Sequence, residues 1–354
     1  MKPVVFQENR VWRAYLGGCG ITFLKTKKES PDNHFPEDWI ASCVEACNHQ
    51  YKKPGQGLSV LENGTLFADY LNSDPEKILG QEHVRKYGNN PGFLMKILDS
   101  AERLPIQVHP TVEDAEKYYH SKQGKTECWY VISTRKVNGV TPCLYLGTNE
   151  TMEKETFLEE AANGVFQKGE SMLRKWEVKP GDVFMVPGGV PHAIGAGVTM
   201  IEVMEPSDWV VQPEHFCGEQ PLTDADRFGP LSSEEALEIF RLEPENLSTA
   251  LQRYCPEPVI IDRMDQFTLS AIVPLNLIKL FEVQKLTGAG DYELQNREAV
   301  CRAGVVTEGN FELGSGEETI KLSTGQSFFL PASGKRFRFR GAGTILFALP
   351  EYHS

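Results

Sequence analysis

Four side chains of the kinds that bind divalent metals stand on short apolar segments of this chain. Gln107 and His109 belong to LPIQVH, and residues two positions apart in a strand point to the same side. Glu127 opens the run ECWYVIS, and His192 follows the turn in GDVFMVPGGVPHAIGAG. One amide oxygen, two imidazoles and one carboxylate on adjacent strands would form a mixed nitrogen and oxygen site, suited to zinc or another first-row divalent ion.

The same side chains also have a plainer interpretation. A lone histidine such as His192 is more often a hydrogen-bonded core or surface residue than a metal ligand, and the triplet QVH says little by itself. A polar pair that points into a small barrel, however, costs on the order of several kcal/mol unless it finds a partner or an ion. The joint occurrence of the four side chains therefore favours a metal site.

The elements that must position these residues are mostly strands. Short apolar or alternating runs are separated by Gly, Pro, Asn and Asp, which is the pattern of many strands and tight turns. Strands are expected over 104–109, 127–133, 142–147, 181–187, 198–205, 275–286, 300–309, 311–316, 319–332 and 335–340. Short helices are expected in DPEKILG and EHVRKYG within the less regular N-terminal part. The fold class is therefore mainly all-β.

An acidic stretch separates two strand-rich regions. In PLSSEEALEIFRL, Ser232 stands three residues before Glu235, which is the signature of a capping box at the start of a helix. Leu237 and Phe240 would form the apolar side of that helix. We therefore expect an acidic helical connector over 221–258, between an N-terminal part that binds metal, 1–220, and a C-terminal barrel, 259–354.

The segment GQSFFLPAS, residues 325–333, repeats the form of GDVFMVPGG, residues 181–189. Internal repetition of this kind suggests two related β-domains. The first copy carries His192 five residues after its proline, whereas the second carries Arg336. The C-terminal barrel is therefore expected to lack a metal site.

Composition excludes several kinds of partner. The 354 residues carry a formal net charge of −13 without a compensating basic block, which disfavours nucleic acid and anionic membranes. No apolar run approaches bilayer length, and the first residues do not read as a secretion signal. The eight cysteines lack paired spacing, which favours reduced thiols. We expect a cytoplasmic monomer or homodimer.

Three segments carry a resemblance to a known family. The order Gly181, Pro187, Gly189 and His192 matches the second motif of the cupin superfamily, with Ala196 where that motif usually ends in Asn. In this order, LPIQVHP, GKTECWYVI and GDVFMVPGGVPHAIGAG resemble class I mannose-6-phosphate isomerases, especially their short bacterial form. The resemblance implies two cupin-type jelly-roll barrels with a few short helices.

The resemblance also implies the roles of individual residues. It implies one zinc ion, Zn²⁺, held by Gln107, His109, Glu127 and His192. It places Lys125 beside a sugar phosphate, and it makes Glu202 a candidate for the proton-transfer base. Asp208 falls on the aspartate of the family's serine–aspartate pair, and the adjacent Trp209 is the tryptophan expected to contact the sugar.

The implied reaction interconverts mannose 6-phosphate and fructose 6-phosphate by moving a proton between C1 and C2 through a cis-enediol. A divalent cation stabilises the negative charge that develops on oxygen. Glu202 would carry the proton if burial raises its pKa, and Lys125 would assist ring opening or meet the anion. The plainer alternatives are a structural ion pair for Glu202 and an exposed turn position for Lys125.

One position departs from the family. An arginine usually follows the serine–aspartate pair by four residues, but SDWVVQPEHF has Gln212 there. A neutral amide does not replace a guanidinium that stabilises phosphate or an oxyanion. The lysine that the family carries shortly afterwards is also missing, since Glu214 and His215 stand in that stretch.

Three interpretations therefore remain open. The protein isomerises mannose 6-phosphate, and another cation compensates, for which the candidates are Arg135, Lys168, Arg174 and Lys175. It isomerises a different or unphosphorylated sugar. It is a metal-binding cupin with little activity that binds sugar in a regulatory role. An iron-dependent oxygenase is disfavoured, because Gln107 stands where a third histidine would be expected.

Overall fold

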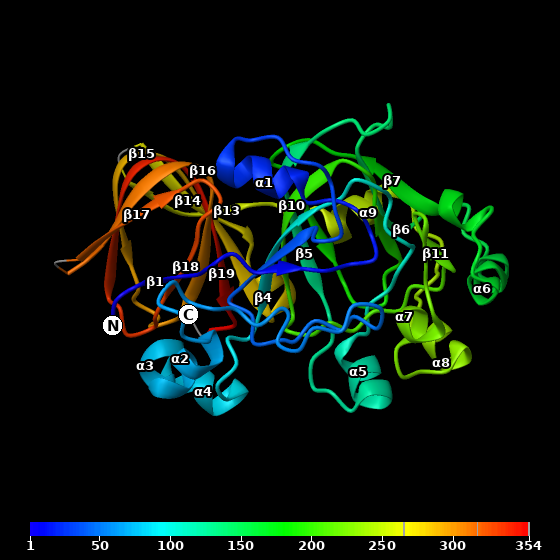
Figure 1. Ribbon diagram of the computed structural model, residues 1–354, viewed down its shortest axis with the longest axis horizontal. Coiled ribbons are helices and arrows are strands. Elements are labelled where there is room, and N and C mark those ends of the chain that lie inside the picture. Colours follow the sequence, from blue (N-terminus) through cyan, green and yellow to red (C-terminus); the bar gives the residue numbers. More distant parts are fainter. Residues whose placement is uncertain (265, 317, 353–354) are drawn as a thin grey trace.

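The computed structural model describes residues 1–264, 266–316 and 318–352, and most of its regular elements are strands (Figure 1). The strands form two main groups. The C-terminal group, drawn in orange and red, lies beside a group built from the first two thirds of the chain. The expectation of a mainly β fold is confirmed.

The C-terminal group is an eight-stranded antiparallel sheet. Its strands are β13 (Val259–Met264), β14 (Phe267–Val273), β15 (Phe281–Gln295), β16 (Arg302–Ser315), β17 (Glu318–Ser323), β18 (Ser327–Leu330), β19 (Arg336–Pro350) and, from the start of the chain, β1 (Val4–Val5). Glycines face each other where the long strands β15 and β19 pair, Gly288 with Gly343 and Gly290 with Gly341. A Cβ at Gly343 would lie 1.9 Å from the carbonyl oxygen of Glu308, so only glycine allows the neighbouring strand this close.

Two further sheets form the barrel that holds the site. The six-stranded sheet runs in the order β2 (Arg10–Val11), β3 (Glu37–Ile40), β4 (Leu94–Asp99), β10 (Val198–Met204), β5 (Glu127–Thr134) and β8 (Val183–Val186). The three-stranded sheet contains β7 (Leu173–Glu177), β6 (Cys143–Thr148) and β9 (His192–Ile194). One buried core joins them, with Trp129 and Met200 from the first sheet and Leu144 and Ile194 from the second.

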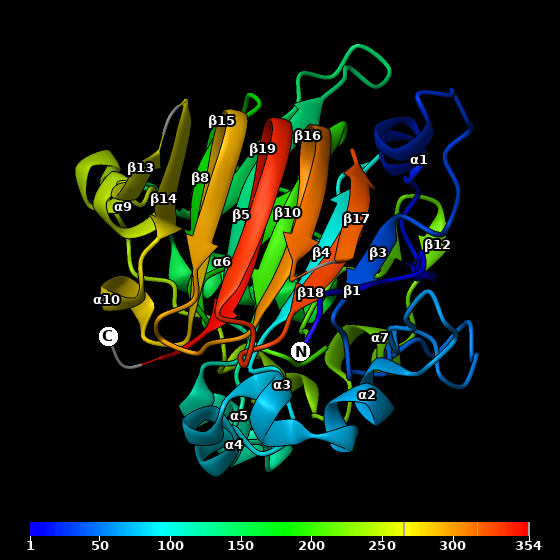
Figure 2. The ribbon, with the colours of Figure 1, turned by 90° about the vertical axis from the view of Figure 1, so that its left-hand side faces the viewer.

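The six-stranded sheet is buried on both faces. Its other face contributes Ile97 and Ile201 to a second core that also contains Val283, Val305 and Leu346 of the C-terminal sheet. Figure 2 shows the C-terminal sheet in front of β4, β5, β8 and β10. Every residue of β4 and β10 is accordingly buried, which explains why these strands are almost continuously apolar.

Short helices and one small hairpin connect the sheets. The helices are α1 (Cys19–Thr26), α2 (Phe67–Ser73), α3 (Pro75–Leu79), α4 (Gln81–Tyr87), α5 (Val112–Tyr119), α6 (Lys154–Asn163), η1 (Gly169–Met172), α7 (Asp224–Phe228), α8 (Ser233–Leu237), α9 (Leu247–Tyr254) and α10 (Leu275–Ile278). The hairpin is β11 (Phe216–Cys217) with β12 (Gln220–Pro221). Within the described residues, no helix combines the length and apolarity that crossing a bilayer requires.

Local predictions had mixed outcomes. The capping box at Ser232 and Glu235 is present and opens α8, although this helix ends at Leu237, before the buried Phe240. The expected strand over 104–109 is wrong, because only isolated bridges form at Gln107 and Val108. The expected strand over 275–286 begins with the helix α10 and becomes a strand only at Phe281. The domain boundaries at 220 and 258 stay predictions.

Candidate active site

The predicted imidazoles and carboxylate come together at one end of the N-terminal barrel. Potential ligand atoms of His109, Glu127 and His192 all lie within 4.8 Å of one another, and the three side chains are buried. Glu127 opens β5 and His192 opens β9, so each is fixed at a strand terminus. His109 is tied to the turn before β9, because the amide of Gly189 donates to its carbonyl oxygen over 2.8 Å.

The glycines of that turn have a steric role. Gly189 has a φ of +84°, and a Cβ there would lie 2.7 Å from Cγ of Arg241. A Cβ on Gly188 would lie 2.8 Å from the carbonyl oxygen of Pro110. The turn therefore packs tightly against the segment that carries His109, and it sets the direction in which His192 enters the barrel.

Both imidazoles are held in one orientation. Nδ1 of His109 lies 2.9 Å from the carbonyl oxygen of Trp209, and Nδ1 of His192 lies 2.9 Å from that of Val190. Since a carbonyl only accepts, each Nδ1 carries the proton and each Nε2 presents a lone pair to the cluster. Nε2 of His192 is buried without a hydrogen-bond partner among the described residues. Burial and the nearby His109 lower the pKa of His192 to about 3, so this imidazole is neutral near pH 7.

Glu127 supplies the negative charge of the cluster. Its Oε2 accepts a hydrogen bond of 3.0 Å from the indole of Trp129, and its Oε1 lies 3.1 Å from Nε2 of His109. Burial alone would raise the pKa of Glu127, but His109 and Lys125 hold it well below its usual value. Burial and the charge of Lys125 also lower the pKa of His109, so an ionised carboxylate faces two neutral imidazoles near pH 7.

Gln107 lies beside these three residues and is hydrogen-bonded to one of them through its backbone. Its amide and carbonyl exchange hydrogen bonds of 2.8 and 2.9 Å with His192, and its side chain lines the same cavity as Glu127. Two imidazole nitrogens, one carboxylate oxygen and a nearby amide are donors of the kinds that bind divalent metals. The unpartnered Nε2 of His192, in the part of the chain that the structure describes, fits that interpretation because a metal would satisfy it.

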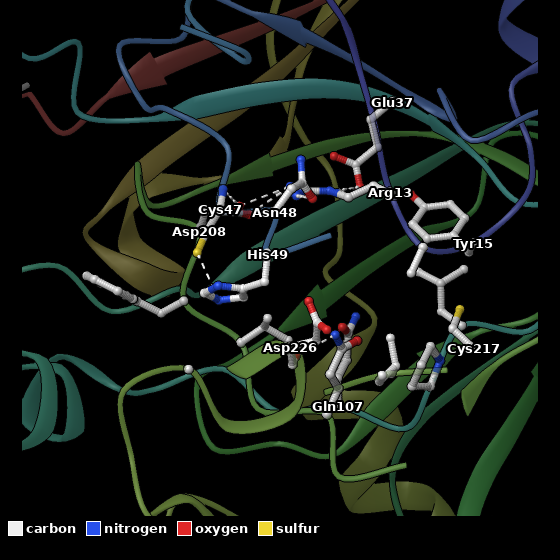
Figure 3. Close-up of a pocket in the computed structure, with 18 of the residues that line it drawn as sticks. Arg13, Tyr15, Glu37, Cys47, Asn48, His49, Gln107, Asp208, Cys217 and Asp226 are labelled. Carbon is white, nitrogen blue, oxygen red and sulfur yellow. Dashed lines mark hydrogen bonds and ion pairs between the residues drawn. The ribbon is translucent and has the colours of Figure 1, made fainter. Parts of the chain in front are cut away.

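A cavity of about 460 Å³ opens beside the cluster (Figure 3). Figure 3 shows Arg13, Asn48 and Asp208 on one wall, with Gln107 and Asp226 across from them. Its charged and polar lining residues are Arg13, Tyr15, Glu37, Asn48, His49, Lys96, Gln107, Tyr119, Lys125, Glu127, Glu202, Asp208, Gln212 and Asp226. A cavity of this size, in which these polar groups lie among apolar residues, accommodates a molecule with several hydroxyl groups.

Glu202 lies on the central strand of the six-stranded sheet and faces the cavity. In register it stands opposite Lys96 of β4 and Trp129 of β5, and Nζ of Lys96 lies 2.9 Å from its Oε1. Burial and the charge of Glu127 raise the pKa of Glu202, and Lys96 only partly opposes them. This carboxyl group is therefore a stronger base than an exposed glutamate.

The side chain of Lys125 extends from the turn before β5 to the candidate metal ligands Glu127 and His109. Its Nζ lies 3.2 Å from Oε1 of Glu127 and 3.2 Å from Nε2 of His109. The carboxylate of Glu205 accepts the amides of Gly124 and Thr126 over 3.2 and 2.9 Å. The turn position that sequence alone left open is thus a buried one that faces the cavity.

The three remaining predicted residues also line the cavity. Both carboxylate oxygens of Asp208 accept from Arg13, over 2.9 and 3.1 Å, so this carboxylate is paired. Trp209 stacks on Tyr119 with ring centroids 4.6 Å apart. Gln212 donates through its side-chain amide to the carbonyl oxygen of Asp226 over 2.9 Å.

Sequence reasoning missed four charged residues of the wall, of which Asp226 lies in the expected helical connector. Arg13, Glu37 and Lys96 come from segments in which no motif was recognised. Burial alone would raise the pKa of Glu37, but Arg13 and Lys96 lower it to about 2. The one available signal was Lys96, a charged residue inside the apolar run LMKILD of β4.

The expectation that another cation compensates for Gln212 needs correction, because none of the four candidates is among the described lining of the cavity. Arg135 pairs with Asp32 and Asp99, and Arg174 pairs with Glu150. Neither they nor Lys168 and Lys175 belong to the described lining of the cavity. The basic residues of the wall are instead Arg13, Lys96 and Lys125.

The repeated segment 325–333 forms a strand followed by a turn, as segment 181–189 does. Like β8 and β9, strands β18 and β19 are joined by a short turn, and Arg336 opens β19 as His192 opens β9. The side chain of Arg336 is 71% exposed, whereas His192 is completely buried. The fold and the site together define a two-barrel cupin with a candidate metal centre in its N-terminal barrel.

Comparison with known proteins shows which family this chain is similar to. Residues 51–135 match the catalytic domain of type I phosphomannose isomerases, and residues 277–350 match the cupin domain of mannose-6-phosphate isomerases. Mannose-6-phosphate isomerase ManA of Bacillus subtilis is 28% identical over 313 residues, which cover 86% of this chain and 88% of that protein. The mannose-6-phosphate isomerase of Streptococcus mutans is 28% identical over 293 residues, covering 80% and 82%.

Solved structures agree on the fold. The mannose 6-phosphate isomerase from Bacillus subtilis has a TM-score of 0.76 at 21% identity, covering 98% of this chain and 99% of that one. A mannose 6-phosphate isomerase bound with zinc and yttrium has a TM-score of 0.72 at 15% identity, covering 99% and 100%. The resemblance to type I mannose-6-phosphate isomerases that the motifs predicted is confirmed by the two family models and by these relatives.

Proposed function

We propose that this chain is a zinc-dependent isomerase that interconverts mannose 6-phosphate and fructose 6-phosphate in the cavity beside Glu127. The observation that carries the proposal is one arrangement of buried groups. The neutral imidazoles of His109 and His192 and the ionised Glu127 adjoin a polar cavity, into which Glu202 and Lys125 also face. The relatives named above support the choice of substrate.

We assign zinc to Gln107, His109, Glu127 and His192 because two neutral imidazoles with a carboxylate and an amide oxygen suit this ion. A bound zinc ion would act as a Lewis acid that stabilises negative charge on a sugar oxygen. The protein contributes the orientation of its ligands. The carbonyl oxygens of Trp209 and Val190 fix the imidazoles before any ligand arrives.

Glu202 is proposed as the group that moves the proton. Its carboxylate takes the proton from C2 of the open-chain aldose and returns it to C1, so one C–H bond breaks and one forms. The proton on the C2 hydroxyl passes to the oxygen on C1, which leaves a ketone at C2. A raised pKa brings the base closer to the working pH and therefore strengthens it.

Lys125 and Asp208 are proposed in supporting roles. The ammonium group of Lys125 stands where it donates to a sugar oxygen during ring opening, next to Glu127. The ion pair with Arg13 fixes Asp208, whose carboxylate is proposed to face the sugar. Trp209 presents one face of its indole ring beside Asp208. Gln212 is proposed to hydrogen-bond a substrate hydroxyl group through its side chain.

The proposal extends to the compartment. The eight cysteines all lie in the described part of the chain and are free thiols, which suits a cytoplasmic enzyme. The choice between a monomer and a homodimer stays a prediction.

A coupled assay tests the proposed function. Zinc-loaded protein should convert mannose 6-phosphate, and His192→Ala should lose both bound zinc and activity. Glu202→Gln should keep its zinc yet stop the exchange of the C2 proton of mannose 6-phosphate with deuterated water. Zinc-loaded protein that is inactive on phosphorylated and unphosphorylated mannose would refute the proposal.

A further inference from the structure

The guanidinium group in the cavity wall is already neutralised. Nε of Arg13 lies 3.1 Å from Oε1 of Glu37, and Nη2 lies 2.9 Å from Oδ1 of Asp208. Its Nη1 donates to Asn48 over 3.1 Å. The side chain is only 12% exposed, so water does not weaken these pairs. Arg13 is therefore bound on all three nitrogens by the protein.

The two lysines of the wall are paired as well. Nζ of Lys96 lies 2.9 Å from Glu202 and 3.7 Å from Glu37. Nζ of Lys125 lies 3.2 Å from Glu127. Over the described residues, each lysine and arginine that lines the cavity thus has a carboxylate partner.

The balance of charge in the wall is acidic. Along the described chain, the lining includes three lysines or arginines and five carboxylates, which are Glu37, Glu127, Glu202, Asp208 and Asp226. One bound divalent ion would only offset the two additional carboxylates. Lys52 and Lys53 follow the rim residue His49 but are exposed and lie outside the described lining, where solvent screens their charge.

Gln212 and Asp226 form a neutral-to-acidic part of this wall. The amide of Gln212 is used on the carbonyl oxygen of Asp226 over 2.9 Å. The carboxylate of Asp226 accepts from the hydroxyl of Thr223, the N-cap of α7, and from the side-chain amide of Gln50 over 3.1 Å. A phosphate dianion finds no guanidinium here, although phosphate is normally bound by charge-assisted, often bidentate, hydrogen bonds.

We infer that this cavity recognises the hydroxyl groups of an aldose and gains little binding energy from a phosphate, so that unphosphorylated mannose is also a substrate. Hydroxyl groups suit the wall because they donate to carboxylates such as Asp208 and accept from amides such as Asn48. A dianion would lose its water without gaining an unpaired cation. The inference rests on the proposed isomerase activity and names the class of substrate for that same site.

The test compares two substrates on the zinc-loaded wild-type protein. We expect kcat/KM for mannose 6-phosphate to exceed that for mannose by less than about a hundredfold. A preference above that value would overturn the inference while leaving the proposed isomerase function intact. Inactivity on both sugars would instead refute the proposed function, so the two failures are distinguishable.

A charge-restoring variant gives a second readout. Gln212→Arg should raise the preference for mannose 6-phosphate over mannose by about tenfold or more, since one charge-assisted contact to phosphate is gained. Gln167→Arg is the matched control, because Gln167 is exposed and outside the described lining, and it should leave the preference unchanged. If the preference is unchanged in Gln212→Arg, the inference that the neutral side chain at position 212 limits phosphate binding is wrong.

Discussion

The carboxylate of Glu205 accepts the backbone amides on both sides of Lys125, those of Gly124 and Thr126. Ser207 adds a third contact, because its hydroxyl donates to the carbonyl oxygen of Gly124 over 2.6 Å. Glu205 is 5% exposed and touches neither of the imidazoles. It is a positioning residue, since it fixes the turn from which Lys125 reaches the cavity.

Glu205→Ala should lower kcat by about ten- to a hundredfold, because a displaced ammonium group loses the alignment that catalysis needs. Bound zinc should remain near wild type, as determined by metal analysis. Glu282→Ala is the control, since it also removes a buried carboxylate but lies in the C-terminal sheet. An unchanged kcat in Glu205→Ala would show that Glu205 does not position Lys125 for catalysis.

Trp129→Phe should weaken zinc binding by about ten- to a hundredfold, as expected when the hydrogen bond that orients a ligand is lost. The change removes the indole N–H that donates to Glu127. Competition with a chromophoric chelator measures the affinity. Trp176→Phe is the matched control, because its indole donates only to the carbonyl oxygen of Leu146. Equal affinities in both variants would show that the contact to Glu127 is unimportant.

Lys96→Met should move the acidic limb of the kcat profile to higher pH. The positive charge of Lys96 lowers the pKa of Glu202, so its removal raises this pKa further, and the base becomes ionised only at higher pH. Steady-state kinetics from pH 5 to 9 would show the shift. Lys96→Arg keeps the charge and should restore the wild-type position. A limb that stays in place in Lys96→Met would mean that another group is titrating.

Glu37→Gln should destabilise the protein near neutral pH and have a diminishing effect in acid. The folded-state pKa of Glu37 is about 2, below its ordinary value of 4.5, so its contribution is complete above pH 4.5 and is lost as pH falls toward 2. A shift of this size corresponds to about 3 kcal/mol. Urea unfolding at pH 7 and at pH 3 measures the difference. Glu62→Gln, which removes an exposed carboxyl, is the control.

The candidate metal ligands could be predicted from the sequence because they lie in short, recognisable segments. His192 follows a turn whose glycines are required sterically, and Glu127 opens a strongly apolar strand. Arg13 was missed for the opposite reason. Its partner Asp208 lies 195 residues away, and no local pattern encodes a pairing across that distance.

Two local predictions failed for identifiable reasons. The segment 104–109 contains Pro105 and is followed by Pro110, which restrict ladder hydrogen bonding, so only single bridges form at Gln107 and Val108. The apolar run from Leu275 follows Pro274 and begins with a helical turn, whose first amide donates to the carboxylate of Glu282. Apolar composition alone does not separate these cases from strands.

One face of the six-stranded sheet is covered by the C-terminal sheet. Ile97 and Ile201 pack directly against the strands that carry Val283 and Leu346. Glu202 stands next to Ile201 on the same strand, with its side chain on the cavity side. The C-terminal sheet therefore supports the strand that carries Glu202. Exchanging barrels between relatives would require this shared apolar layer to be exchanged with them.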